Sequence, residues 1–282
     1  MPPLVTVIAP GAMGAAVGKR LADHGLKVLT ALDGRSETTA ARARAAGMTP
    51  ASDVEIASAD FILSILPPGD ALSLAQRFAP VLGASNVKPV YVDCNAISPA
   101  TVGRVAAAIA PTGCPFVDAG IIGPPPRTGD AGPRFYASGA AASRFATLRD
   151  FGLDIRVLAG PINAASALKM SYAGITKGTQ AIGAAMILAA TRAGSAEALF
   201  EELSFSQIEL FAWLKQQLAI MPPKAYRWVA EMQEIADFAA ADPAAHELYQ
   251  GAAHFYQRIA DDFSAGKKNV SALESFLRKS GD

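Results

Sequence analysis

The chain opens with a short apolar run followed by a glycine turn. Residues 4–9 (LVTVIA) are rich in β-branched side chains and favour a strand, and the turn GAMG follows at residues 11–14. Residues 15–24 then have a helical pattern that Gly25 closes. Strand, glycine turn and helix in this order begin a βαβ unit in which the first N–H groups of the helix face a bound phosphate. The start of the chain therefore predicts a dinucleotide-binding fold.

The rest of the first half alternates short apolar runs with helical patterns. Ser98 is placed to cap one of the predicted helices, and Pro99 lies in its first turn. Strands are expected at residues 27–32, 60–66, 89–94, 114–119 and 134–138, and helices at residues 37–46, 71–82 and 99–110. This alternation predicts an α/β Rossmann domain, with a mostly parallel sheet and helices on both of its faces.

The second half has a different character. Residues 164–193 form one long apolar-rich stretch without proline, and no convincing strand follows it. We expect a Rossmann dinucleotide-binding domain over residues 1–162 and, after a long interdomain helix, an all-helical domain within residues 163–282. Such a helical domain has more apolar surface than one small domain can bury, which predicts a homodimer formed through it.

The composition excludes several classes of protein. Lys+Arg and Asp+Glu both number 25 in 282 residues, so the chain lacks the positive charge of a nucleic-acid-binding protein. Two cysteines and three histidines without metal-ligand spacing predict no metal site. The longest apolar run, residues 181–190, is about half as long as a membrane span, and the first residues lack the basic segment of a signal peptide. We expect a cytoplasmic protein that binds neither membrane nor nucleic acid.

The glycine turn matches the pattern G-x-G-x-x-G at two of three positions, because Ala9 replaces the first glycine. Gly11 lets the backbone approach a pyrophosphate, and Gly14 lets the helix pack close to the strand. The backbone of Ala12 and Met13, between them, presents N–H groups to the phosphates. A plain strand-to-helix turn is the alternative, but the position at the start of a βαβ unit favours dinucleotide binding.

The residues after the second predicted strand indicate which dinucleotide is bound. An NAD site needs an Asp or Glu about 20 residues after the glycines to hold the ribose hydroxyls. Leu32 stands at that position, and Asp33 is one residue late. Gly34, Arg35 and Ser36 follow, and Arg and Ser side chains are good donors to a 2′-phosphate. We expect NADP(H), with Asp33 serving NAD(H) as the less favoured alternative. Structurally, Arg35 is otherwise a solvated charge and Ser36 a helix cap.

Five features in register resemble one family. They are PGAMG at residues 10–14, ILPP at 65–68, VDCNAISP at 92–99, DAGIIG at 118–123, and Lys169. The chain resembles the β-hydroxyacid dehydrogenases, the group of 6-phosphogluconate dehydrogenase and 3-hydroxyisobutyrate dehydrogenase. Its helical remainder is more similar to a branch of that group with a short helical C-terminal domain.

The resemblance implies roles for particular residues. It implies an active site between the two domains, Lys169 as the acid/base, and cofactor contacts from Leu66, Pro67 and Asn95. The chemistry agrees, because hydride transfer to or from an alcohol carbon needs a group that takes or gives the hydroxyl proton. Lys169 lies in AASALKM, a segment otherwise without charge, where a lysine should have a partner or a ligand. Lys177, eight residues on and on a similar helical face, is the competing candidate.

Three positions depart from the family's pattern. Tyr172 stands three places after the lysine, where the family often carries Asn, and is expected to hydrogen-bond the substrate or to be a core aromatic. Ile122, followed by Gly123 and three prolines, replaces a serine that grips the substrate carboxylate. Asn95 keeps a polar group near the nicotinamide, as a substrate ligand or a turn residue. These changes argue against a simple hydroxy-acid substrate.

Together these observations predict an NADP(H)-dependent oxidoreductase that moves a hydride between the nicotinamide and a small hydroxy or carbonyl substrate. Arg127 and Arg134 flank the proline-rich loop and are candidate anion ligands for that substrate. An imine reductase of similar architecture is one alternative, although such enzymes tend to lack the lysine. A non-catalytic NADP(H)-binding sensor is another, suggested by the altered substrate loop.

Overall fold

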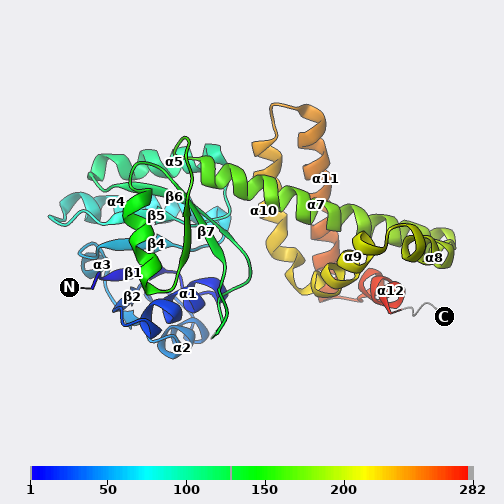
Figure 1. Ribbon diagram of the computed structural model, residues 1–282, viewed down its shortest axis with the longest axis horizontal. Helices are drawn as coiled ribbons and strands as arrows, with labels where there is room; N and C mark the ends of the chain where they lie inside the picture. Colours follow the sequence, from blue (N-terminus) through cyan, green and yellow to red (C-terminus); the bar gives the residue numbers. More distant parts are fainter. Residues whose placement is uncertain (1, 128, 279–282) are drawn as a thin grey trace. The chain divides into compact units, whose positions relative to one another are not determined.

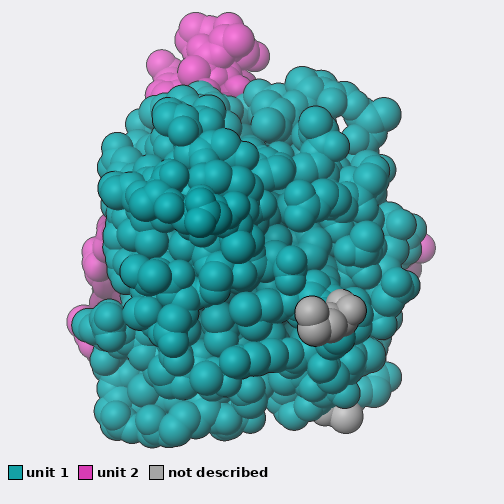
Figure 2. Space-filling view, turned by 90° about the vertical axis from the view of Figure 1, so that its left-hand side faces the viewer, with its two compact units in different colours: residues 1–170 teal, residues 171–282 magenta. Residues whose placement is uncertain are grey.

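The computed structural model describes residues 2–127 and 129–278. The chain divides into two compact units, residues 1–170 and 171–282, which we call unit 1 and unit 2 (Figure 2). Within the described residues, every strand belongs to unit 1, and unit 2 is helical. The predicted order, an α/β half followed by a helical half, is therefore confirmed.

Unit 1 is built on an eight-stranded sheet. Its strands are β1 (Val5–Ile8), β2 (Val28–Thr30), β3 (Thr49–Pro50), β4 (Phe61–Ser64), β5 (Val90–Asp93), β6 (Phe116–Ile122), β7 (Arg134–Ser138) and β8 (Asp154–Val157). The order is β3-β2-β1-β4-β5-β6-β7-β8, and neighbouring strands are parallel except β6 and β7. The first six strands have the Rossmann arrangement, in which the carboxyl ends of parallel strands meet at one edge.

Helices cover both faces of this sheet because its strands are apolar on both sides. They are α1 (Ala12–Asp23), α2 (Glu37–Ala45), α3 (Asp53–Ile56), α4 (Ala71–Ala84), α5 (Pro99–Ile109) and α6 (Ala142–Phe145). In β5, Val90 and Val92 belong to one core with Val17 of α1, whereas Tyr91 belongs to a second core with Phe78 of α4. Figure 1 shows α1 and α2 on one side of the strands and α4 and α5 on the other.

Unit 2 consists of helices packed through aromatic side chains. Helix α7 (Ala164–Ala193) begins in unit 1 and coincides with the predicted apolar stretch. It is followed by α8 (Ala196–Ser206), α9 (Ile208–Ile220), α10 (Ala225–Phe238), α11 (Pro243–Ser264) and α12 (Lys268–Leu277). Phe200, Phe211 and Phe276 join α8, α9 and α12 through edge-to-face contacts with centroids 5.2, 5.7 and 6.0 Å apart. None of the helices in the described part of the chain has the length and apolarity needed to cross a bilayer.

Three element bounds differ from the prediction in ways that matter for the site. Strand β6 begins two residues later than expected and continues to Ile122, so Ile122 closes a strand. Helix α1 begins at Ala12, three residues earlier than expected, which places Gly14 inside the helix. Strand β2 is only three residues long, and Leu32 lies in the loop after it. The cap of α5 is as predicted, with Ser98 accepting the N–H of its third residue.

Strands β3 and β8, at the two edges of the sheet, were not predicted. Strand β3 is two residues long and contains Pro50, and β8 carries Asp154 and Arg156. Proline, charge and short length are typical of edge strands, and they weaken the sequence signal of a strand. The predicted boundary after residue 162 lies before α7, whereas the compact units divide inside this helix, after Met170.

Candidate functional site

The glycine turn between β1 and α1 leaves open space beside the first turn of the helix. Gly11 is the N-cap of α1, and a Cβ built on it would have no heavy atom within 4 Å. A Cβ on Gly14 would lie 2.1 Å from the Ala9 carbonyl oxygen, so glycine is what permits this close approach. Among the described residues no side chain caps α1 and no acidic residue lies in its first turn. The N–H groups of Ala12 and Met13 are therefore available to an anion.

The loop after β2 carries the residues predicted to select the cofactor. Asp33, Gly34, Arg35 and Ser36 are all exposed. Gly34 has a φ of 71°, a conformation that glycine adopts without strain. The Ser36 Oγ accepts the Thr39 N–H at 3.3 Å and caps α2. Ser36 thus has a structural role, and Arg35 is an exposed cation of this loop.

Asn95 joins the two loops that follow β4 and β5. Its Oδ1 accepts the Leu66 N–H at 2.6 Å, and its Nδ2 donates to Ser64 Oγ at 2.9 Å. Its own N–H donates to Asp93 Oδ1 at 3.0 Å, and only 2% of the residue is exposed. The Asn95 side chain therefore fixes the backbone of Leu66, and with it Pro67, at the carboxyl end of β4.

Four buried polar side chains lie side by side across β4, β5, β6 and β7. The register pairs Ser64 with Asp93, Asp93 with Asp118, and Asp118 with Ser138. Burial disfavours the charged form, and it raises the pKa of Asp93 to about 7 and that of Asp118 to about 6. Sequence reasoning missed the importance of both aspartates. The signal that marks them is a carboxylate within an otherwise apolar strand, at its last residue in β5 and at its third residue in β6.

Asp118 fixes the first turn of α7 on the sheet. Its carboxylate accepts the Ser166 N–H at 2.8 Å and the Ser166 hydroxyl at 2.6 Å. Beside it, the Ser138 Oγ accepts the Ala165 N–H at 3.0 Å. A carboxylate at a helix N-terminus satisfies N–H groups that the helix itself leaves without partners. The start of α7, and Lys169 one turn later, is thereby held against β6.

Lys169 lies over β6 because Gly120 has no side chain. A Cβ on Gly120 would come within 3.0 Å of the Lys169 Cβ and 2.9 Å of the Ala165 carbonyl oxygen. Gly120 lies two residues beyond Asp118 toward the carboxyl end of β6, so the two share one face of the strand. Lys169 is half-buried. It stands near the sheet edge at which β1, β4 and β5 also end.

The strand end beside Lys169 offers few backbone donors. Ile122 is the last residue of β6, and Gly123 follows with a φ of 129°. A Cβ on Gly123 would lie 3.0 Å from the Pro133 Cα, so the turn into the loop requires glycine. The three prolines at residues 124–126 lack N–H groups.

Two further predicted site residues belong to unit 2. Tyr172 is exposed on α7. Lys177 forms an ion pair with Glu231, lies 5.1 Å from the centroid of the Trp228 ring, and has a side chain 17% exposed. The Lys177 ammonium group is thus bound to a carboxylate within the helical unit.

Two family descriptions match the chain. Residues 4–151, just over half of the sequence, match the NAD binding domain of 6-phosphogluconate dehydrogenase. Residues 190–259 match a domain of unknown function, DUF1932. The chain therefore belongs to the family of proteins with the NAD-binding domain of 6-phosphogluconate dehydrogenase.

Two relatives are close enough in sequence to support this assignment. An uncharacterised 28.5 kDa protein of Methanothermus fervidus is 30% identical over 188 residues, which are 66% of this chain and 70% of that protein. A conserved protein of unknown function, whose structure is described as similar to 3-hydroxyacid dehydrogenases, is 32% identical. The match covers 91% of this chain and 96% of that one, with a TM-score of 0.69.

More distant solved structures share the fold alone. The 3-hydroxyisobutyrate dehydrogenase of Mycobacterium tuberculosis, solved with L-serine, is 22% identical, with a TM-score of 0.68 over 99% of this chain and 100% of that one. An imine reductase from Myxococcus stipitatus, solved with NADP+, is 18% identical, with a TM-score of 0.53 over 98% and 100%. The chain thus has a hydroxyacid-dehydrogenase-like fold with a nicotinamide-dinucleotide-binding domain.

Proposed function

We propose that the protein is an NADP(H)-dependent oxidoreductase acting on a small hydroxy or carbonyl substrate. The observation that carries this proposal is the position of Lys169. Asp118 and Gly120 hold it over the carboxyl half of β6. The parallel strand β1 ends at the same edge of the sheet, and the glycine turn follows it. A proton-transferring amine and a dinucleotide turn at one sheet edge are the parts that hydride transfer needs.

In this proposal the dinucleotide binds along the carboxyl edge of the sheet. The open space at Gly11 and the N–H groups of Ala12 and Met13 receive the pyrophosphate. Gly34, Arg35 and Ser36 face the adenosine ribose, where the Arg35 guanidinium is the donor suited to a 2′-phosphate. The site residues fit a dinucleotide, because Gly14 lets α1 approach the strand closely while the space at Gly11 stays open. Leu66 and Pro67, held by Asn95, border the nicotinamide half.

Lys169 serves as the acid/base in this mechanism. When bound, the nicotinamide accepts or supplies the hydride. The Lys169 Nζ takes the hydroxyl proton during oxidation and returns it to the carbonyl oxygen during reduction. Asp118 acts through the backbone of α7 and keeps the lysine in place, so it is a positioning residue.

The proposed substrate contacts come from Asn95, Ile122, Gly123 and Tyr172. The side-chain amide of Asn95 is hydrogen-bonded to the Leu66 N–H and to Ser64 Oγ. Its proposed contribution is therefore to shape the wall of the substrate pocket. Ile122 and the prolines after Gly123 give this side of the pocket an apolar character with few N–H donors. We therefore propose a substrate that lacks the carboxylate of a simple hydroxy acid at this position, with the Tyr172 hydroxyl as a donor.

Cofactor binding followed by a lysine variant tests the proposal. Purified protein is titrated with NADPH and NADH by fluorescence, and turnover is then measured with a panel of alcohols, aldehydes, ketones and imines. In Lys169→Ala, kcat should fall about 10²–10⁴-fold while the NADPH affinity stays within about twofold, because only proton transfer is lost. Lys177→Met, which removes the ammonium group but keeps most of the unbranched side chain, is the comparison. A larger loss of kcat in Lys177→Met at unchanged melting temperature would contradict the assignment.

Reduction of a C=N bond is the second candidate, favoured by the shared fold of the imine reductases. Full activity of Lys169→Ala on imines would support it. Tight cofactor binding without turnover of any compound in the panel would instead support a sensor. Binding of neither NADPH nor NADH would contradict all three functions.

We also propose that the protein is a homodimer formed through unit 2. Three apolar side chains on α7 are largely exposed: Ile175 by 69%, Ile182 by 52% and Met186 by 58%. Their spacing of seven and four residues places them on one face of the helix. An apolar groove of about 450 Å³ between α7 and α11 adjoins this face and includes Leu248. Exposed apolar surface of this kind is typical of protein interfaces.

A further inference from the structure

A cavity of about 440 Å³ lies along the outer face of α1 and reaches Ala12 in the first turn of that helix. Alanines of α1 and α2 form its floor, and residues 126–127, from the loop between β6 and β7, form one wall. Its charged lining residues are Lys19, Arg20, Asp23, Arg42 and Arg127. Four cations and one carboxylate line the cavity, so its lining carries an excess of positive charge.

Two of these cations have carboxylate partners. Lys19 Nζ lies 2.9 Å from Asp23 Oδ1. Arg20 Nη2 lies 2.8 Å from Asp130 Oδ1, and its side chain is 13% exposed. Within the described part of the chain, no carboxylate pairs with Arg42 or Arg127. The positive charge of the cavity is therefore concentrated on these two guanidinium groups.

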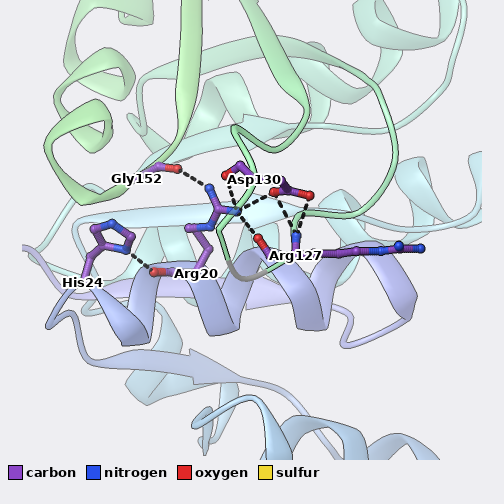
Figure 3. Close-up of polar contacts among 5 residues, drawn as sticks. All are labelled: Arg20, His24, Arg127, Asp130 and Gly152. Atoms are coloured by element: carbon purple, nitrogen blue, oxygen red, sulfur yellow. Dashed lines mark hydrogen bonds and ion pairs between the residues drawn. The ribbon is translucent and has the colours of Figure 1, made fainter.

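The Arg20–Asp130 pair fixes the loop that carries Arg127 (Figure 3). Arg20 Nη2 donates to the carbonyl oxygens of Arg127 at 2.8 Å and Asp130 at 3.1 Å, and Nη1 donates to the Gly152 carbonyl at 3.3 Å. The Asp130 carboxylate accepts the Arg127 N–H, with both oxygens at 3.0 Å. The Arg127 N–H and the Arg20 guanidinium hold the pKa of Asp130 below its usual value. The Asp130 carboxylate thus stays ionised at neutral pH.

The backbone of Arg127 is anchored, but its side chain is directed elsewhere. Figure 3 shows it extending along α1, away from His24 at the carboxyl end of that helix. It therefore runs toward the N-terminal half of α1, where Ala12 also lines the cavity. Among the described residues the Arg127 guanidinium makes no hydrogen bond or ion pair.

Arg42 approaches the same end of the cavity from α2. Its Nη1 donates to the Pro10 carbonyl oxygen at 3.2 Å, which places the guanidinium beside the glycine turn. One hydrogen bond uses only part of a guanidinium, which has five N–H donors. Two guanidinium groups that line one cavity without carboxylate partners repel each other unless an anion lies between them. The planar, bidentate donors of arginine match the oxygens of a phosphate.

We propose that Arg42 and Arg127 together bind a phosphate group of the dinucleotide beside the first turn of α1. The inference rests on the proposed function, because it needs a bound dinucleotide. Such a ligand offers two candidate phosphates, the 2′-phosphate of NADP and the pyrophosphate shared with NAD. Neither arginine belongs to the glycine-turn motif, whose own donors are the N–H groups of Ala12 and Met13. The role of Arg127 would also make the loop between β6 and β7 part of the cofactor site.

Equilibrium titrations of full-length Arg42→Ala and Arg127→Ala with four ligands test the proposal. The ligands are NADPH, NADH, adenosine 2′,5′-bisphosphate and adenosine 5′-diphosphate. Arg44→Ala and Arg156→Ala are matched controls, because Arg44 pairs with Glu37 on an exposed face of α2 and Arg156, also exposed, pairs with Asp154. Loss of a charge-assisted phosphate contact should weaken binding about 10-fold or more. Melting temperatures of all variants are measured alongside.

The pattern across ligands identifies the phosphate. If the two arginines bind the 2′-phosphate, the variants should bind NADPH and the 2′,5′-bisphosphate more weakly, while their affinity for NADH and the diphosphate stays unchanged. If the pyrophosphate is bound, Arg127→Ala weakens NADPH, NADH and the diphosphate by a similar factor. Arg127→Ala decides this case, since Arg42 also supports the glycine turn through Pro10.

Three outcomes would overturn the inference. One is affinity within about twofold of wild type in Arg127→Ala, and another is an equal loss in the control variants. The third is a wild-type protein that binds none of the four ligands, which would remove the proposed function as well. The first two leave wild-type NADPH binding intact, so they are distinguishable from a failure of the proposed function.

Discussion

Gly11 and Gly14 lie three residues apart, yet an added methyl group meets different surroundings at each. At Gly11 it would point into open space, whereas at Gly14 it would lie 2.1 Å from the Ala9 carbonyl oxygen. The first glycine is therefore free of packing constraints in the protein alone. Its proposed role appears only when a phosphate approaches the backbone.

Substitution by alanine should consequently affect ligand binding at Gly11 and folding stability at Gly14. The free energy of unfolding of Gly11→Ala should lie within about 1 kcal/mol of the wild-type value. The variant should bind NADPH at least about 10-fold more weakly, because the added methyl group occupies the space of the phosphate. Gly14→Ala should lose about 1–3 kcal/mol or more of unfolding free energy through overpacking. Urea denaturation and fluorescence titration of both variants measure these effects. Wild-type affinity in a folded Gly11→Ala would contradict the phosphate position.

Asp93 is a buried carboxyl group whose Oδ2 has no hydrogen-bond partner among the described residues. Burial, with the nearby Asp118 adding to it, raises its pKa from 3.8 to about 7. Between pH 4 and 7 the folded state then holds a proton that the unfolded state has released. The contribution of Asp93 to stability is therefore complete below about pH 4 and is lost as the pH rises through about 7.

Asp93→Asn should remove this part of the pH dependence. A shift of about three pKa units corresponds to about 4 kcal/mol at most. The difference in melting temperature between pH 5 and pH 8 should shrink by several degrees in the variant, with Asp150→Asn, an exposed aspartate, as the control. Equal differences in wild type and Asp93→Asn would show that Asp93 titrates normally.

At the scale of elements, the start of α7 depends on a contact between distant parts of the chain. Asp118 of β6 and Ser166 of α7 are 48 residues apart and are joined by two hydrogen bonds, at 2.8 and 2.6 Å. The start of the helix at Ala164 was predicted from the local sequence, but its attachment to β6 depends on this long-range contact. Because the contact is buried, removing the carboxylate leaves two donors without partners.

Asp118→Ala should therefore cost about 2–3 kcal/mol of unfolding free energy and speed hydrogen exchange in the first turn of α7. Asp242→Ala is the matched control, because Asp242 caps α11 at an exposed site, where a lost cap costs about 1 kcal/mol. Equal costs in the two variants would mean that burial adds nothing to the Asp118 contact. A lower kcat at an unchanged cofactor affinity would further support its role in positioning Lys169.

At the scale of the whole molecule, the exposed apolar face of α7 bears on the number of subunits. Ile175, Ile182 and Met186 lie beside the groove between α7 and α11. Burying such side chains in a second copy contributes roughly 1.5–3 kcal/mol each. This is enough for a face of several residues to support association.

Ile182→Glu should therefore shift the protein to a monomer at micromolar concentration, since a charge in an apolar interface has no partner. Sedimentation velocity measures the change, with Val54→Glu, an exposed apolar residue of unit 1, as the control for added charge. A wild-type protein that sediments as a monomer would contradict the proposed homodimer.

The accuracy of the sequence predictions follows the range of the interactions behind them. The strand, turn and helix around Gly11 were predicted because strand preference and glycine spacing act within a few residues. The bounds of α7 were predicted from an apolar run without proline. Strands β3 and β8 were missed because edge strands lack an apolar pattern.

The sequence by itself determined the fold class, the glycine turn and the lysine on α7, because these depend on strand preference, glycine spacing and apolar runs that act within short segments of the chain. Only the tertiary structure decided that Asp118 and Gly120 hold Lys169 against β6, and that Arg42 and Arg127 line one cavity. These groups come from segments far apart in the chain. Their proximity follows from strand order and loop packing, which composition and spacing do not encode.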